Sequence, residues 1–167
     1  MAYPTEYCYG LGCNPTDQKA VRRILRLKRR SWAAGLIIIA ADLRQLTRLV
    51  DLSDELLLDA PRSSWPGPHT WLLPALPGTP KWIRGQHHTV AVRVTAHPVA
   101  KILCQRFGSA IVSTSANRHG RAPLRTAGRV HNEFGDGVDF ILEGQIGTAS
   151  APSSIHDAQS GQIIRPS

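Results

Sequence analysis

Three short polar segments carry the residues of this chain whose types and spacing could do chemistry. They are YPTEYCYGLG at residues 3–12, the K-x-R formed by Lys28 and Arg30, and VSTSAN at residues 112–117. Hydroxyls, an amide and fixed cations can hold carboxylate and phosphate groups through charge-assisted hydrogen bonds. None of these segments has the spacing of a strong metal site or the order of a Ser–His–Asp hydrolase. The segments therefore predict an enzyme that positions charged substrates and does not attack them with its own side chain.

The VSTSAN segment places two serines, a threonine and an asparagine directly after an apolar stretch. Side chains of these types often bond to nearby backbone groups and close a turn. The same groups can also act as neutral donors to carboxylate and phosphate oxygens in a site that already holds cations. The residues alone leave both interpretations open for Ser113, Ser115 and Asn117.

A dense run of cations, RRILRLKRR at residues 22–30, lies where a helix is expected to end. Such a run usually forms a solvated face, and cations near a helix C-terminus are favoured by the helix dipole. The run could also form an RNA-binding stripe, although no aromatic side chains are interleaved with it for base stacking. Taken by itself, the cationic run at residues 22–30 therefore favours a solvated helix face.

Arg93 differs from these cations because it interrupts the apolar strand sequence TVAVRV at residues 89–94. A guanidinium on the face of a sheet needs a partner, and its planar fork matches a carboxylate. That carboxylate could belong to a substrate or to a structural salt bridge. The sequence does not distinguish the two.

Composition limits the class of protein to which the chain can belong. Its 167 residues are 42% hydrophobic and 19% charged, which is typical of one globular domain with a substantial core. The formal net charge of +8 favours polyanionic partners such as nucleotides, RNA or an anionic membrane surface. The longest apolar run, at residues 35–41, is too short to span a bilayer, and no signal peptide opens the chain. We therefore expect a cytoplasmic protein with no membrane segment.

The three cysteines, Cys8, Cys13 and Cys104, are an odd number at wide spacing. This pattern argues against a disulfide framework and favours a reducing compartment. The cysteines and the scattered histidines show no metal-ligand spacing, so we expect no protein-bound metal site.

Apolar patterns and turn residues predict strands that alternate with helices. The expected helices cover residues 16–30, with Thr16 as N-cap, a short segment after Asp42, residues 98–107, and residues near 126–134; the expected strands lie at or near residues 35–41, 70–73, 89–94, 110–112, 138–142, 154–156 and 162–165. Such alternation indicates an α/β fold, a twisted mixed sheet with flanking helices in one domain. Ligands of such sheets bind at strand ends, where VSTSAN and Arg165 are expected to lie.

Eight segments in order are similar to the YrdC/Sua5 family of threonylcarbamoyl-AMP synthases. They are YPTE with YGLG, K-x-R, GLIIIAA, WPGPHT, AVRVTAHPVA, VSTSAN, PSSIHD and IIRPS. The resemblance is collinear over residues 1–167 and is greatest to the short bacterial form with a single domain. It implies the family's twisted α/β sheet with a basic concave face. It also implies ATP, L-threonine and bicarbonate as substrates, with threonylcarbamoyl-adenylate and pyrophosphate as products, for the t6A modification of tRNA.

The resemblance also assigns roles to individual positions. It implies ATP binding by Lys28, Arg30, Thr70, Ser115, Asn117 and Arg165, and threonine binding by Thr5, Arg93, Ser113 and Ser153. Threonine carbamate is itself the nucleophile in this chemistry, so no protein nucleophile is expected. Mg²⁺ is expected with ATP and can be held largely by substrate and water. The proteins that transfer the product to tRNA, and tRNA or double-stranded RNA on the basic face, are the expected partners.

The family has about twenty residues before the YPTE motif, whereas only Met1 and Ala2 precede Tyr3 in this chain. The resemblance therefore implies that an N-terminal helix and part of the first strand are lacking. We expect unpaired backbone and apolar surface beside residues 3–6.

Two functions of different classes fit these residues. The first is the adenylate-forming enzyme described above. The second is a basic RNA-binding or ribosome-maturation factor that uses the same surface without turnover. A carbamoyl-adenylate-forming module, like the similar domain of the much longer hydrogenase-maturation carbamoyltransferases, is a third candidate and ranks last.

Overall fold

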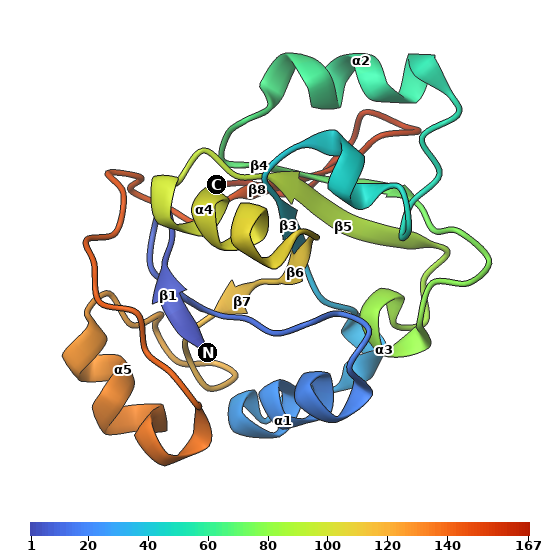
Figure 1. Cartoon of the computed structure of the whole chain (residues 1–167). Helices are drawn as coiled ribbons and strands as arrows, with labels where there is room; N and C mark the ends of the chain where they lie inside the picture. The colour runs from blue at the N-terminus through green and yellow to red at the C-terminus, as the bar shows by residue number, and fades with distance from the viewer.

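The computed structural model describes residues 1–167 and contains two β-sheets with helices around them (Figure 1). The strands are β1 (Ala2–Pro4), β2 (Tyr9–Leu11), β3 (Ile38–Ala40), β4 (His69–Pro74), β5 (Thr89–Val94), β6 (Ile111–Val112), β7 (Thr114–Ser115), β8 (Ser154–Asp157) and β9 (Ile163–Arg165). The larger sheet has the order β6-β3-β5-β4-β8-β9, and the smaller sheet has the order β1-β2-β7. The larger sheet is mixed, because β5 is parallel to β3 and antiparallel to β4. The predicted α/β class with a mixed sheet is therefore confirmed.

The central strand β3 is buried on both faces, which explains its uninterrupted apolar sequence. Ile38 and Ala40 point into the main hydrophobic core, whereas Ile39 points into a second, smaller core on the opposite face. In the neighbouring β5, Val90, Val92 and Val94 all belong to the main core. The alternation of side chains along a strand then places Arg93 on the opposite face from these valines.

The chain passes from one sheet to the other at Ser113, the residue between β6 and β7. β6 pairs with β3 of the larger sheet, and β7 pairs with β2 of the smaller sheet. The backbone N–H of Ser113 donates to the carbonyl of Ile37 at 2.8 Å, which fixes this crossing point. At Gly12, just after β2, a Cβ atom would come within 2.7 Å of the carbonyl oxygen of Val112, so the close approach requires glycine. The VSTSAN segment thus begins where the two sheets meet.

Five α-helices surround the sheets: α1 (Gln18–Lys28), α2 (Glu55–Ser64), α3 (Lys81–Arg84), α4 (Pro98–Phe107) and α5 (Ala127–Phe134). In Figure 1, α4 lies in front of the sheet, α2 lies above it, and α1 and α5 lie below. Short 3₁₀ helices cover Trp32–Ala34, Leu43–Leu46 and Gly135–Gly137. None of the helices is both long enough and apolar enough to cross a membrane.

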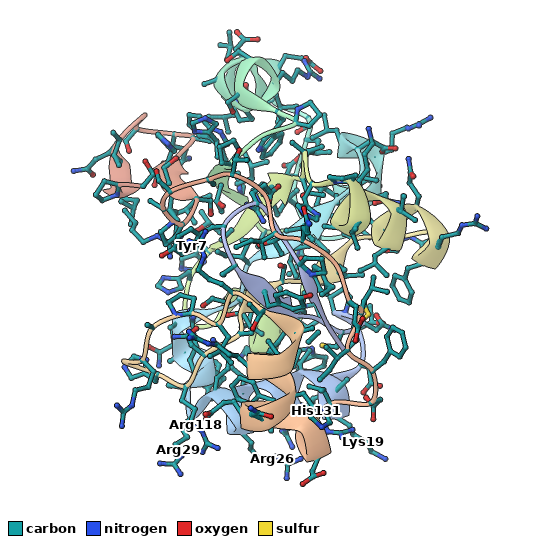
Figure 2. The ribbon with its side chains drawn as sticks, turned by 90° about the vertical axis from the view of Figure 1, so that its left-hand side faces the viewer. Tyr7, Lys19, Arg26, Arg29, Arg118 and His131 are labelled. Carbon is teal, nitrogen blue, oxygen red and sulfur yellow. The ribbon has the colours of Figure 1, made fainter.

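Helix α1 has two faces of different chemistry. Its inner face buries Val21, Ile24, Leu25 and Lys28, whereas Lys19, Arg22, Arg26 and Arg29 are exposed. Figure 2 shows Lys19, Arg26 and Arg29 at the lower edge of the molecule. The amphipathic pattern explains why this helix packs on the core with a cationic side facing outward.

Helix α4 begins and ends where the sequence predicts. Pro98 occupies its first turn, and Gly108 adopts the left-handed conformation at its C-cap with φ of 75°. Ala100 and Cys104 of this helix pack in the smaller core with Tyr3 and Ile39. The helix therefore covers the sheet face opposite the main core.

Two expectations about individual elements need correction, and helix α2 was not predicted. Asp17, and not Thr16, is the N-cap of α1, because Asp17 accepts from the backbone of Lys19 at 2.9 Å while the Thr16 hydroxyl donates to Asn14. Asp42 caps a short helix as predicted, since its side chain accepts from the backbone of Arg44, but that helix is a 3₁₀ helix, Leu43–Leu46. Helix α2 was not indicated by the pattern, because Pro61 lies inside it.

The segment at residues 138–142 is not a strand, and its pairing also corrects the expectation for the N-terminal residues. It forms a single bridge to β1, in which Ala2 donates to the carbonyl of Phe140 at 2.8 Å and accepts from Leu142 at 2.9 Å. The backbone of residues 3–6, which was expected to be unpaired, is also bonded: Tyr3 and Pro4 pair with β2, and the carbonyls of Thr5 and Glu6 accept from the N–H groups of Gly147 at 2.9 Å and Ala149 at 3.2 Å. The side chain of Phe140 is nevertheless exposed, with a relative surface area of 59%.

Candidate active site

A cleft opens at the ends of several strands, and we call it the central cleft. Seven of the ten predicted site residues line it: Thr5, Arg30, Arg93, Ser113, Ser115, Ser153 and Arg165. Thr5 follows β1, Arg30 follows α1, and Arg93 lies in β5. Ser113 and Ser115 lie where β6 leads into β7, Ser153 precedes β8, and Arg165 ends β9. Residues far apart in the sequence are thus gathered at strand ends, where α/β sheets usually bind ligands.

The other three predicted residues, Lys28, Thr70 and Asn117, lie directly behind the lining. Thr70 is fully buried, and its hydroxyl is 3.0 Å from the hydroxyl of Ser153. The Asn117 side-chain oxygen accepts from the Ser115 hydroxyl at 2.6 Å. Each of these three residues therefore contacts or positions a residue that does line the cleft.

Asn117 closes the VSTSAN segment into a hydrogen-bonded turn. Its side-chain nitrogen donates to the carbonyls of Arg118 at 3.1 Å and Arg121 at 2.6 Å. The backbone N–H of Ala116 donates to the carbonyl of Tyr9 at 2.7 Å. Both interpretations of this segment therefore hold in part, since Asn117 is used within the turn while Ser113 and Ser115 line the cleft.

Lys28 holds this turn from the inner face of α1. The residue is only 3% exposed, and its Nζ donates to the carbonyl of Ser115, to the carbonyl of Asn117 at 2.9 Å and to the Asn117 side chain at 3.2 Å. Burial, reinforced by the nearby charge of Arg30, lowers the pKa of Lys28 to about 8. Lys28 thus supports the wall of the cleft with the three N–H groups that it has.

Three arginines place their guanidinium groups around the central cleft. Arg30 donates to the carbonyl of Gly35 at 3.0 Å, and Arg165 donates to the carbonyl of Ser153 at 2.6 Å. Burial lowers the pKa of Arg165, and repulsion from Arg30 and Arg93 lowers it further. Cations close enough to repel one another form a site that favours anions.

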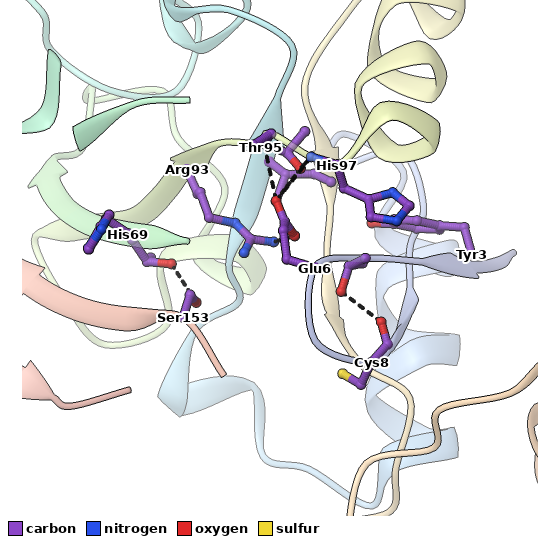
Figure 3. A network of polar contacts seen from close by, with 12 residues as sticks. Tyr3, Glu6, Cys8, His69, Arg93, Thr95, His97 and Ser153 are labelled. Carbon is purple, nitrogen blue, oxygen red and sulfur yellow. Dashed lines mark hydrogen bonds and ion pairs between the residues drawn. The ribbon is translucent and has the colours of Figure 1, made fainter. Parts of the chain in front are cut away.

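Arg93 has an internal partner that the sequence analysis did not identify. Its Nη2 lies 3.2 Å from Oε2 of Glu6, and the two side chains are only 9% and 13% exposed. Glu6 Oε1 accepts from the Thr95 hydroxyl at 2.6 Å and from the backbone N–H groups of Ala96 and His97 at 3.2 and 3.3 Å (Figure 3). The structural salt bridge left open by the sequence therefore exists. The signal that could have identified Glu6 is its position in the YPTE segment, directly after the predicted site residue Thr5.

Burial opposes the charge on Glu6, but Arg93 and the Thr95 hydroxyl outweigh it and lower the pKa of this carboxyl group. Glu6 is therefore ionised at neutral pH. Cys8, another lining residue, behaves differently, because burial raises the pKa of its thiol to about 11. Cys8 is therefore a protonated thiol at neutral pH and a poor nucleophile.

The fold and the cleft together define an α/β protein with an anion-binding site at the strand ends, and comparison with known proteins identifies the family. The Sua5_yciO_yrdC family, described as "Telomere recombination", matches residues 1–167. Proteins named threonylcarbamoyl-AMP synthase from Methylococcus capsulatus and Coxiella burnetii are 53% and 46% identical, each over 165 residues that cover 99% of this chain and 89% of the relative. The chain belongs to the Sua5/YciO/YrdC family.

Solved structures agree with this assignment. The structure of P. abyssi Sua5 complexed with L-threonine has a TM-score of 0.86 and 35% sequence identity. The match covers 93% of this chain and 46% of that protein, so this chain spans slightly less than half of its length. The structure of E. coli YciO, at 24% identity, has a TM-score of 0.82 and supports the fold.

Proposed function

We propose that this protein makes L-threonylcarbamoyladenylate from ATP, L-threonine and bicarbonate or CO₂, with release of pyrophosphate, for the t6A modification of tRNA. The observation that carries the proposal is the convergence of Arg30, Arg93 and Arg165 with serine and threonine hydroxyls in one cleft. The relatives named threonylcarbamoyl-AMP synthase support it over almost the whole chain. The chain is then a transferase, and we infer that it is a nucleotidyltransferase in particular.

We assign the two ends of the central cleft to the two larger substrates. Threonine would be bound by Thr5, Arg93, Ser113 and Ser153, with the Arg93 guanidinium on its carboxylate. The triphosphate of ATP would be bound by Arg30, Arg165 and Ser115, while Lys28, Thr70 and Asn117 shape that wall. This assignment leaves Lys28 a role in ATP binding that acts through the turn it supports.

The reaction needs alignment and charge neutralisation and no protein nucleophile. The ammonium group of threonine first loses one proton. The neutral amine then adds to CO₂, which forms an N–C bond and a carbamate and releases a second proton. A carbamate oxygen then bonds to the α-phosphorus of ATP as the bond from that phosphorus to the bridging oxygen breaks, and pyrophosphate leaves. The arginines of the cleft would bind the phosphate oxygens and neutralise their developing charge.

We propose that Mg²⁺ enters with ATP. No group of three or more His, Cys, Asp or Glu side chains is placed to hold a metal ion. The one carboxylate of the central cleft, Glu6, is already bound to Arg93 and Thr95. The residues present therefore suit an ion held by phosphate oxygens and water, with serine and threonine hydroxyls nearby.

A direct test is to measure pyrophosphate release with each substrate omitted in turn. We expect release only when ATP, threonine and bicarbonate are all present. Serine should react less well than threonine, because it lacks the methyl group that an apolar contact would hold. Equal release of pyrophosphate without any amino acid would contradict the proposal.

A second surface favours RNA as an additional partner, and we call it the α1 groove. It is lined by the cations Lys19, Arg22, Arg26, Arg29, Arg30 and Lys81, by Trp32 and Trp82, and by no acidic residue. Trp32 is 46% exposed, so an aromatic side chain is available for base stacking after all. We propose that tRNA or double-stranded RNA contacts this groove through its phosphates.

The binding of a labelled RNA stem-loop across a series of salt concentrations tests the α1 groove. We expect the double variant Arg22→Ala with Arg26→Ala to weaken binding and to reduce the salt dependence by about one phosphate contact per arginine removed. The matched control is Arg48→Ala, which removes an exposed arginine outside the groove. Equal effects of both changes would show that only net charge matters. Strong RNA binding without pyrophosphate release would favour the non-catalytic alternative.

We also propose that the product passes to the proteins that transfer threonylcarbamoyl to tRNA, and that the protein works in the cytoplasm. Cys8, Cys13 and Cys104 are all free thiols, which suits a reducing compartment. Loss of t6A in cells depleted of this protein, restored by the wild-type chain, would test the pathway assignment.

A further inference from the structure

The charges of the central cleft are divided unequally between its two ends. Three guanidinium groups line the cleft, and Glu6 is the only carboxylate among the lining residues. Glu6 forms an ion pair with Arg93, whereas Arg30 and Arg165 donate hydrogen bonds only to neutral carbonyl oxygens. The Arg93 end is therefore close to neutral, and the end with Arg30 and Arg165 keeps two uncompensated positive charges.

The two carboxylate oxygens of Glu6 also have different surroundings. Oε1 accepts three hydrogen bonds from residues 95–97, which fixes the plane of the carboxylate. Oε2 is buried and has no hydrogen bond, and its nearest partner is Nη2 of Arg93 at 3.2 Å. The Nε of Arg93 is also buried without a partner. The pair thus makes one contact and leaves the remaining N–H groups of the guanidinium without a protein hydrogen bond.

We propose that Glu6 is a positioning and specificity residue that reserves the Arg93 end of the cleft for a zwitterionic amino acid. The inference rests on the proposed function. Glu6 orients the Arg93 guanidinium for the amino-acid carboxylate and cancels its net charge. An amino acid with no net charge fits a neutral subsite, whereas pyrophosphate or a triphosphate needs uncompensated cations. Without Glu6, all three arginines would attract phosphate groups.

The decisive variant is Glu6→Gln, which keeps an acceptor oxygen for Thr95 but removes the charge. We expect the KM for threonine to rise about tenfold or more, because the Arg93 guanidinium loses the carboxylate that orients it for the amino acid. The KM for ATP should stay the same or fall. Inorganic pyrophosphate should become a stronger inhibitor, competitive with threonine, by about tenfold. A residue needed only for folding would not strengthen pyrophosphate binding, so this readout separates the two roles.

Two further variants serve as controls. Glu6→Asp restores the charge, so pyrophosphate inhibition should return toward the wild-type value even where threonine binding stays weak. Glu55→Gln breaks an exposed ion pair with Arg62 on α2 and should change neither constant. Melting temperatures measured for each variant establish that the compared proteins are folded.

Unchanged threonine KM or unchanged pyrophosphate inhibition in Glu6→Gln would overturn the proposal. If that variant does not fold, Thr95→Val decides, because it removes one hydrogen bond to Oε1 and keeps both charges. It should weaken threonine binding about threefold without strengthening pyrophosphate binding, and unaltered threonine binding would reject the positioning role.

If wild-type protein releases no pyrophosphate in a threonine-dependent way, the proposed function fails. Direct calorimetric binding of pyrophosphate to wild-type and Glu6→Gln protein still tests the effect of Glu6 on charge.

Discussion

The cations of the central cleft and those of the outer face of α1 are of the same residue types but have opposite surroundings. Lys28 and Arg93 are 3% and 7% exposed, and each is held by named protein atoms. Lys19, Arg22, Arg26 and Arg29 are exposed and form no ion pair. A buried cation fixes nearby groups in one geometry, whereas an exposed cation contributes mainly to a long-range potential. The comparison therefore predicts large, specific effects for the first group and small, salt-dependent effects for the second.

The largest effect is expected for Lys28→Ala. The change leaves the carbonyls of Ser115 and Asn117 without their shared donor, so the wall of the cleft should loosen. We expect pyrophosphate release to fall roughly a hundredfold or more. We also expect the free energy of unfolding to fall by about 1–3 kcal/mol, as measured by denaturant titration.

Arg30→Ala is the matched control for the combined loss of activity and stability expected in Lys28→Ala. Its guanidinium makes one hydrogen bond, to Gly35, so stability should change less while pyrophosphate release again falls roughly a hundredfold. Full activity in both variants would remove Lys28 and Arg30 from the ATP site.

Arg93→Lys should have the next largest effect, confined to the amino-acid end of the cleft. Lysine keeps the charge opposite Glu6 but cannot present a planar fork to a carboxylate. We expect the KM for threonine to rise about tenfold and the KM for ATP to change little, as measured by steady-state pyrophosphate release. An unaltered threonine dependence would remove Arg93 from the threonine site.

A smaller effect should appear as a pH dependence that the exposed arginines of α1 cannot produce, because arginine stays protonated at these pH values. Burial lowers the pKa of Lys28 to about 8 from its ordinary 10.5, so ATP binding should weaken as pH rises through 8 and Lys28 loses its proton. Calorimetric titration of ATP between pH 7 and pH 9.5, at roughly half-unit steps, measures this. The variant Lys28→Gln should show no such dependence, and a flat wild-type profile would contradict the assignment.

The stability contribution of Lys28 should change with pH in the opposite direction. Between about pH 8 and pH 10.5 the unfolded state keeps the Lys28 proton while the folded state releases it. The unfolded state then binds more protons, so this group's contribution to the free energy of unfolding rises with pH across that window. Below the folded pKa, the cost of burying the charge is fully present.

The smallest effect on catalysis is expected for Arg26→Ala on the outer face of α1. Its side chain is exposed and forms no ion pair, so pyrophosphate release should stay within about twofold of the wild type. RNA binding should weaken mainly at low salt. A large loss of pyrophosphate release in this variant would show that the two groups of cations are not separate.

Much of the fold and of the candidate site could be predicted from local patterns. The apolar run at β3, the alternation in β5, and the Pro98 and Gly108 boundaries of α4 follow from side-chain periodicity and backbone preference. The site residues were implied by the family resemblance, and seven of the ten line one cleft because strand ends of an α/β sheet meet at one edge. Patterns of this kind depend only on neighbours in the sequence.

The sequence by itself determined which residue types are present, the α/β class, the elements β3, β5 and α4, and the resemblance to the family. Only the tertiary structure decided that Lys28 faces inward while Arg29 faces solvent, and that Glu6 compensates Arg93 and not Arg30. The same is true of residues 138–142, which were expected to form a strand but form only one bridge, to Ala2. The physical reason is that burial and charge pairing depend on contacts between distant segments, and these form only when both sheets and α1 have packed together.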